Sequence, residues 1–193
     1  MAIDTGLLVE CSDLNAVGGI RQIILTDLGN IATVAPSAAA ADHIISSFVA
    51  TSPWARFEFK NETAALAITG TKEGGSTAYE CALSFYIPEM NADRMAQLSK
   101  LEDACPVAIV EMNSGEQFII GYSYKYENLG GGATPWARNQ TYANLTSIEG
   151  GTGSAYADDN GLTVTLTARQ FELPFNYSGA ITVAATSLTA TTD

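Results

Sequence analysis

His43 is the chain's only histidine and the first residue to consider for acid–base or nucleophilic chemistry. It follows a run of small residues, and Asp42 is its neighbour in sequence rather than a partner placed across a fold. Such chemistry needs a nucleophile on a sharp turn near the base, and no G-x-S-x-G pattern is present. The sequence therefore predicts no catalytic residue and a structural or surface role for His43.

Four consecutive residues, Asp158-Asp159-Asn160-Gly161, resemble part of a calcium-binding loop. With Gly161 as the sixth residue of such a loop, its first and twelfth positions fall on Tyr156 and Thr167, where carboxylates are required. An Asn-Gly hairpin turn accounts for the same residues without a metal. We therefore expect a turn here and no metal site.

Glycine and cysteine spacing predicts no cofactor. Gly130, Gly131 and Gly132 lack the Lys-Ser/Thr pair that follows the glycines of a phosphate-binding loop. The cysteines are odd in number and share no C-x-x-C spacing, which favours free thiols over a zinc site or a disulfide framework. They are Cys11, Cys81 and Cys105.

Residue types alone leave two other functional classes open, a glycoside hydrolase and a carbohydrate-binding protein. Acidic side chains are plentiful, and a glycoside hydrolase needs only two of them, enclosed in a cleft. The aromatic residues are also compatible with the sugar-stacking platform of a carbohydrate-binding β-sandwich. Three of these residues share one face of a single predicted strand, which favours a core or interface role instead. The platform would comprise Trp54, Trp136, Tyr122, Tyr124 and Tyr126.

The charge of the chain limits the classes of partner that we expect it to bind. Nine Lys and Arg residues against 21 Asp and Glu give a formal net charge of −12 over 193 residues. Nucleic-acid binders take most of their affinity from cations on phosphates, so a simple DNA or RNA binder is not expected. Charged residues make up only 16% of the chain, and interface cores are depleted in charge. The composition therefore favours a surface that meets other protein surfaces, although a neutral monomeric β-sandwich would share it.

No apolar run is long enough to cross a membrane. The N-terminus lacks a basic region followed by a long apolar segment, so no secretion signal is predicted. We expect no membrane partner, and synthesis in a cytoplasm where the thiols stay reduced.

Alternating apolar and polar residues predict a single β-rich domain over residues 1–186, followed by a flexible tail at 187–193. A hairpin is expected to turn at Lys72-Glu73-Gly74-Gly75-Ser76, with Gly74-Gly75 at its tip, and to project beyond the domain body. The predicted strands cover 20–26, 43–49, 54–60, 64–69, 77–87, 107–110, 117–124, 162–169 and 180–185.

One short α-helix is predicted at about 91–104. Asn91 suits the N-cap, Asp93 the first turn and Lys100 the last turn, and Pro106 prevents continuation. An apolar stripe at helical spacing would lie on a sheet. The stripe consists of Met95, Leu98, Leu101 and Cys105.

A long Gly-rich loop is predicted at 127–160, because glycines and a proline interrupt every periodic pattern there. Trp136 lies among small and polar neighbours in this loop. It is interpreted either as an anchor for a partner surface or as a side chain that folds back onto its own sheet.

Four segments carry a family resemblance by their order and type. They are the hairpin 73–80 running into 83–90, the helix with Leu98 and Leu101, the strands at 107–121 joined by Asn113-Ser114-Gly115, and the strand within 158–167. In this order they resemble the tail-tube and related tail structural proteins of long-tailed bacteriophages. The resemblance spans roughly the second half of the hairpin region to the final strands.

The resemblance implies an antiparallel β-sandwich or barrel with one flanking helix, in a non-enzymatic protein of the virion tail. Six copies would form a ring with a continuous inner β-barrel, and stacked rings would conduct viral DNA without binding it specifically. Its partners would be further copies of itself and other phage tail proteins. A tail adaptor, terminator or baseplate ring protein is the alternative within this class. The expected subunit interface comprises Lys72, Glu73, Gly74, Gly75, Gly130, Gly131, Gly132 and Trp136.

Overall fold

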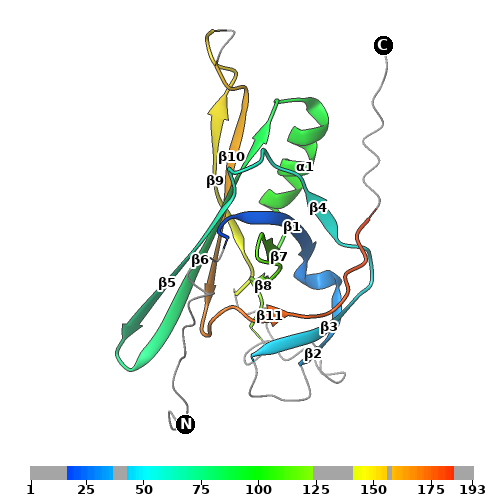
Figure 1. Ribbon diagram of the computed structural model, residues 1–193, viewed down its shortest axis with the longest axis vertical. Coiled ribbons are helices and arrows are strands. Elements are labelled where there is room, and N and C mark those ends of the chain that lie inside the picture. Colours follow the sequence, from blue (N-terminus) through cyan, green and yellow to red (C-terminus); the bar gives the residue numbers. More distant parts are fainter. Residues whose placement is uncertain (1–16, 37–42, 124–140, 156–157, 185–193) are drawn as a thin grey trace.

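The computed structural model describes residues 17–36, 43–123, 141–155 and 158–184. They form two β-sheets and one α-helix (Figure 1). The strands are β1 Ile20–Asp27, β2 Ile31–Pro36, β3 Ile44–Ala50, β4 Ala55–Phe57, β5 Ala65–Glu73, β6 Ser76–Pro88, β7 Pro106–Met112, β8 Gln117–Ile120, β9 Asn144–Gly151, β10 Gly161–Gln170 and β11 Asn176–Tyr177. Helix α1 spans Ala92–Glu102, and a 3₁₀ turn, η2, spans Leu28–Asn30. The predicted β-rich sandwich with one helix is confirmed, and the described strands do not close into a barrel.

The seven-stranded sheet has the order β2-β3-β11-β8-β7-β1-β4, and its strands β1, β7 and β8 are buried on both faces. Along β1, Ile23 and Leu25 pack into one hydrophobic cluster while Ile24 between them packs into the other. Strand β7 alternates in the same way, with Val110 and Ile109 on opposite faces. This double burial explains why both strands are continuous apolar runs rather than alternating ones.

The second cluster lies on the side of this sheet that faces away from the four-stranded sheet, and the sheet curls around it. Ile31 of β2 and Trp54, which directly precedes β4, both belong to this cluster although β2 and β4 are opposite edges. Strand β3 runs on into β4 through residues 51–54 alone, which also draws the two edges toward each other. The sheet is therefore a curled layer with its own core.

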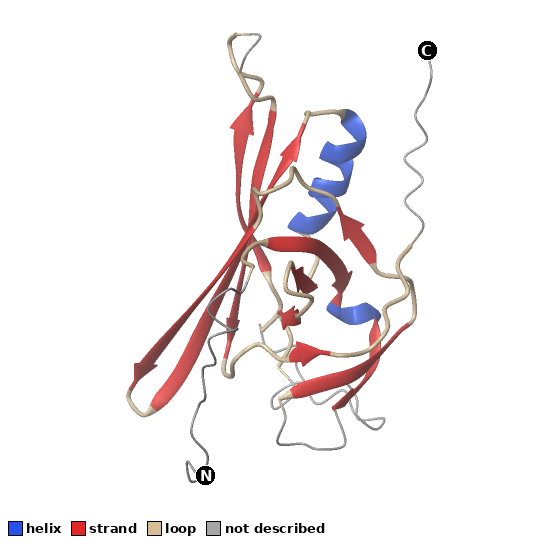
Figure 2. Cartoon of the chain, in the orientation of Figure 1, coloured by secondary structure: helices blue, strands red, loops and turns tan. Residues whose placement is uncertain are grey.

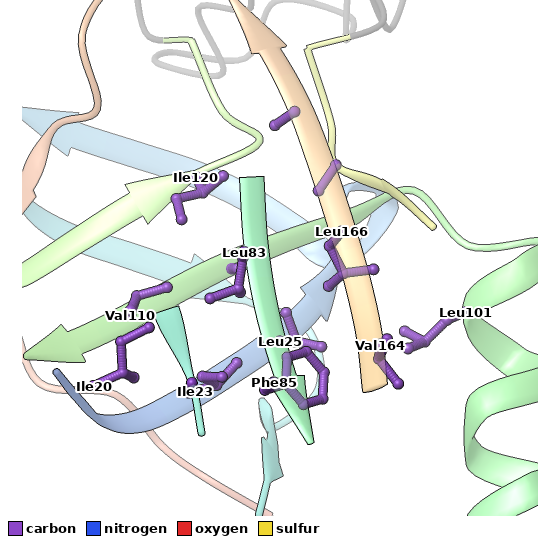
Figure 3. Packing of buried hydrophobic residues seen from close by; sticks show 14 of the residues in the cluster. Ile20, Ile23, Leu25, Leu83, Phe85, Leu101, Val110, Ile120, Val164 and Leu166 are labelled. Carbon is purple, nitrogen blue, oxygen red and sulfur yellow. The ribbon is translucent and has the colours of Figure 1, made fainter. Parts of the chain in front are cut away.

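The four-stranded sheet has the order β5-β6-β10-β9 and is antiparallel throughout. Its inner face packs on the first cluster, where Leu83 and Phe85 of β6 meet Val164 and Leu166 of β10 (Figure 3). The predicted alternation along 77–87 is confirmed, since the residues on one side are buried from Cys81 onward and their neighbours are only partly covered.

The hairpin β5–β6 turns through two residues, Gly74 and Gly75, whose φ angles are 54° and 86°. Positive φ at both central residues is the requirement of a type I′ turn, which glycine meets at no steric cost. Strand β10 ends at Gln170, opposite Tyr79, so the end of the hairpin extends beyond its neighbour in the sheet (Figure 2). The predicted tip is confirmed, and the turn is tighter than expected because β5 continues to Glu73.

Helix α1 begins as predicted. The side chain of Asn91 accepts a hydrogen bond from the Arg94 backbone N at 2.9 Å, which caps the first turn. Leu98 and Leu101 are buried against the first cluster. Met95 is half exposed, so its predicted place in the buried stripe is wrong; the buried residues of the helix are Leu98 and Leu101, in its later turns.

The structure corrects the predicted loop at 127–160. Residues 144–151 form β9, which pairs with β10 along its length, so a hairpin occupies this part of the chain. The predicted Asn160-Gly161 turn is also wrong, since Gly161 starts β10 and pairs with Gly151. The local preference of Gly150 and Gly151 favours a loop, but their pairing with β10 outweighs that preference.

Three predicted strands are shorter than expected, and β2 and β11 were missed in addition to β9. The strand predicted at 117–124 ends at Ile120 as β8. The strand at 54–60 reduces to the three residues of β4, and Trp54 instead bonds to the C-terminal segment, with Trp54 N to Thr182 O at 3.0 Å. The strand at 180–185 reduces to an isolated bridge between Trp54 and Val183 within the described residues. Strands β2 and β11 were not predicted, because each holds its place through pairing with β3 rather than through its own pattern.

Candidate assembly surface

The predicted interface residues fall into two groups. Lys72, Gly74 and Gly75 are exposed at the end of the β5–β6 hairpin, and Glu73 is the last residue of β5 there. The structure therefore brings this half of the predicted interface together at a projecting tip. The other half, Gly130, Gly131, Gly132 and Trp136, lies outside the described residues.

One face of the four-stranded sheet points away from the first cluster, and among the described residues no element packs over it. We call it the open face and define it by alternation from the buried inner residues. Its side chains are small and mostly uncharged. From β5 to β9 they are Ala65, Ala67, Thr69, Thr71, Ala78, Glu80, Ala82, Ser84, Tyr86, Thr163, Thr165, Thr167, Arg169, Asn144, Ser147 and Glu149.

The open face was missed as a functional surface, although the sequence carried a signal for it. In β10 the run Leu162-Thr163-Val164-Thr165-Leu166-Thr167 places a threonine at every outward position. An exposed sheet face of a soluble monomer usually carries many Lys and Glu residues. Here only Glu80, Glu149 and Arg169 are charged, and most of the other side chains are alanine, serine or threonine.

Strands β5 and β9 are the two edges of this sheet, and each pairs with a described strand on one side only. Strand β5 is nine residues long and β9 is eight, and their outward residues are exposed or half-buried. A long edge strand presents a row of backbone N–H and C=O groups that can pair with another chain. The geometry thus offers two edges of matching length on opposite sides of one sheet.

A hollow of about 450 Å³ lies across β5, β6 and β10 near the base of the projecting hairpin. Glu80 is its single carboxylate and lies near Arg169. General acid–base hydrolysis of a glycoside needs two carboxyl groups flanking the bond, which this hollow does not provide. Its remaining lining residues are Thr69, Thr71, Ala78, Tyr79 and Phe171.

Beneath the hairpin base, a buried polar chain connects the two sheets. The Cys81 thiol donates to Gln170 Oε1 at 3.2 Å, and Gln170 Nε2 donates to the Tyr122 carbonyl at 2.8 Å. Burial, with a smaller contribution from the negative charge of Glu80, raises the pKa of the Cys81 thiol to about 11. The thiol therefore stays protonated at neutral pH and serves as a structural donor rather than a nucleophile.

His43 holds a loop in place. Its Nε2 lies 2.7 Å from the Leu173 carbonyl oxygen, and its ring stacks on Phe175 with centroids 3.9 Å apart. Its backbone φ of 52° lies in the left-handed region. These contacts agree with the structural role predicted for this histidine. Within the described residues, no group of three or more His, Cys, Asp or Glu side chains is placed to hold a metal ion.

The side chains of Asp158 and Asp159, which precede Asn160, both interact with other groups of the protein. Asp158 accepts hydrogen bonds from the backbone N of Ser154 and Ala155 at 2.7 and 2.8 Å. These bonds lower the pKa of the Asp158 carboxyl. Asp159 forms an ion pair with Lys60, with Nζ to Oδ1 at 3.0 Å. Both carboxylates therefore have partners within the protein.

The aromatic residues considered for sugar binding do not form a surface platform where they are described. Trp54 and Tyr122 are buried in the second cluster, with 3% and 0% of their surfaces exposed. Phe48 packs edge-on against both of them. Tyr124, Tyr126 and Trp136 lie outside the described residues. The interpretation of Trp54 and Tyr122 as sugar-stacking groups is therefore wrong.

A scan against protein-family models and searches of curated proteins and of solved structures found no match to this chain. Among the described residues, none of the helical structure has the length and apolar character needed to span a bilayer.

Proposed function

We propose that this chain is a structural subunit of a phage tail, most closely of the tail-tube type. In this proposal its copies close into rings, of six by the family resemblance, that stack into a conduit for viral DNA. The observation that carries the proposal is the four-stranded sheet, which within the described residues has two unpaired edges and one uncovered face of small, mostly neutral side chains.

The strand order supports ring closure through these edges. The four strands alternate in direction, so β5 and β9 run antiparallel to each other across the sheet. If β5 of one copy lies beside β9 of the next, the added pair is antiparallel as well, and the ladder continues without a change of type. A contact between two different edges is heterologous, and such contacts generate rings when the rotation between copies closes.

The two hairpins of this sheet support stacking. The β5–β6 turn and the β9–β10 connection lie at opposite ends of the sheet, because Gly161 pairs with Pro88 at one end and Gln170 with Tyr79 toward the other (Figure 1). A projecting hairpin at one end can reach the connection at the opposite end of a copy in the next ring. The exposed tip with Lys72, Gly74 and Gly75 is the part of the predicted interface that would make this contact.

The open face supports the role of a conduit wall. The curled sheet and helix α1 cover the inner face, so closure of the four-stranded sheet into a ring leaves the open face toward the lumen. Threonine, alanine and serine offer no cation to a phosphate, and the overall charge of −12 repels one. Duplex DNA would therefore pass this wall without being held.

Negative-stain electron microscopy of the purified protein, with light scattering on the same sample, tests the proposal. We expect rings or hollow tubes and a scattering mass that is a multiple of the 20.3 kDa chain. Tubes of many rings indicate a tube subunit, whereas single rings indicate an adaptor, terminator or baseplate protein. A particle of one chain at every concentration would contradict ring assembly.

A further inference from the structure

Two cations lie on or beside the open face, which is otherwise free of positive charge in the described residues. Arg169 is the last outward residue of β10, and Lys60 lies beside β6, where its backbone N bonds to the Tyr86 carbonyl at 2.9 Å. Lys72 at the hairpin tip belongs to the opposite face, because it pairs with Thr77. In a conduit for DNA, an unmasked cation repeated around each ring would bind phosphates and slow passage.

Arg169 faces a carboxylate across the sheet. It pairs in register with Glu80 of β6, and both side chains are exposed on the open face and line the hollow at the hairpin base. Directly opposite residues of antiparallel strands have Cβ atoms about 5 Å apart. No ion pair joins the two side chains, so Glu80 acts on Arg169 as a neighbouring charge rather than as a salt-bridge partner.

Lys60 is neutralised more directly. Its Nζ lies 3.0 Å from Oδ1 and 3.1 Å from Oδ2 of Asp159. It also lies 5.6 Å from the centre of the Tyr86 ring, which belongs to the open face. The carboxylate and the ring both reduce what the ammonium group can offer to a phosphate.

We propose that Glu80 and Asp159 are charge-masking residues that keep Arg169 and Lys60 from binding a polyanion at the open face. Each carboxylate lies beside one cation, so each cation that the described residues place on or beside the face has a negative charge next to it. The inference rests on the proposed conduit function for its biological meaning. The masking itself is a property of one chain and can be measured on a single subunit.

The test follows the Nε–Hε resonance of Arg169 in ¹⁵N-labelled protein during titration with a short DNA duplex at low ionic strength. Arg169→Gln identifies the resonance by its disappearance. Glu80→Gln removes the masking charge without changing the size of the side chain. Glu102→Gln is the matched control, because it changes the net charge equally but lies at the end of helix α1, away from the open face.

We expect the Arg169 resonance of Glu80→Gln to shift at a DNA concentration about fourfold lower than in the wild type. This factor corresponds to the loss of one unit charge about 5 Å away in a water-like dielectric. Asp159→Asn should act in the same way on the Lys60 ammonium resonance. Glu102→Gln should match the wild type.

Equal titrations for Glu80→Gln and Glu102→Gln would overturn the proposal, since net charge alone would then account for any change. A wild-type Arg169 resonance that already shifts as readily as that of Glu80→Gln would overturn it too. The spectrum of each variant reports whether it is folded. Absence of rings by microscopy would contradict the conduit, and the titration would still decide whether Glu80 masks Arg169.

Discussion

The two sheets of this protein use similar strands in different ways. The seven-stranded sheet buries both faces of its central strands and encloses a core of its own, so successive residues from Ile23 to Leu25 of β1 and from Val107 to Val110 of β7 contribute to packing. The four-stranded sheet buries one face and leaves the other to small hydroxyl and methyl side chains. Under the proposed function, the comparison separates stability from assembly: the first sheet contributes to the core on both sides, and the second would provide the surface and the edges for other copies.

The largest expected effect tests where stability resides. Ile109 of β7 is 1% exposed in the second cluster, and Ile109→Ala should lower the free energy of unfolding by about 2–5 kcal/mol. Thr165 at the centre of the open face is the matched position in the other sheet, and Thr165→Ala should cost about 0.5 kcal/mol or less. Urea unfolding of both variants measures the difference. Similar losses would mean that the open face is also packed in the folded protein.

The next prediction concerns how stability depends on pH through Cys81, on the inner face of the four-stranded sheet. We expect this face to exclude water as the core of the curled sheet does. The folded pKa of Cys81 is about 11 against 9.0 for an ordinary thiol. Below pH 9 both states are protonated and Cys81 contributes no pH dependence. Between about pH 9 and 11 the unfolded thiol loses its proton while the folded one keeps it, so stability should fall by about 2 kcal/mol.

Urea unfolding of wild type and Cys81→Ala across this pH range isolates the contribution, because all other titrating groups are common to both proteins. The wild type should lose more stability than the variant between pH 9 and 11. Parallel curves would show that the thiol is hydrated in the folded state.

The last prediction concerns the hairpin tip, where a substitution should disturb assembly more than folding. Gly74 and Gly75 have positive φ, and an added Cβ at either would meet no atom within 4 Å, so only backbone strain opposes substitution. Replacing both by alanine should cost about 1–2 kcal/mol at each position and distort the hairpin tip. Gly18→Ala, which is equally unobstructed and has no positive φ, is the control.

Light scattering and electron microscopy of the double variant measure the second part of this prediction. We expect a folded subunit, checked by thermal unfolding, that no longer stacks. Tubes indistinguishable from those of Gly18→Ala would remove the hairpin tip from the stacking contact.

The sequence alone was sufficient for features that depend on neighbouring residues. Two adjacent glycines predicted the hairpin turn, because few other residues adopt positive φ twice in succession. The Asn91 cap and the buried alternation from Cys81 to Ile87 were predicted for the same reason, since capping and pleating repeat over a few residues. Half of the predicted interface, at the hairpin tip, followed directly from the turn.

Only the tertiary structure decided which face of each strand is covered. Trp54 lies beside the exposed Arg56 in a pattern that alternates, yet it is buried because the C-terminal segment bonds to it from more than 120 residues away. Strand β9 contains two glycines and is stabilised by β10, and the open face exists because the curled sheet packs on the other side. Local preferences amount to fractions of a kcal/mol per residue, whereas pairing and burial against distant segments contribute several, so the distant partners determine these features.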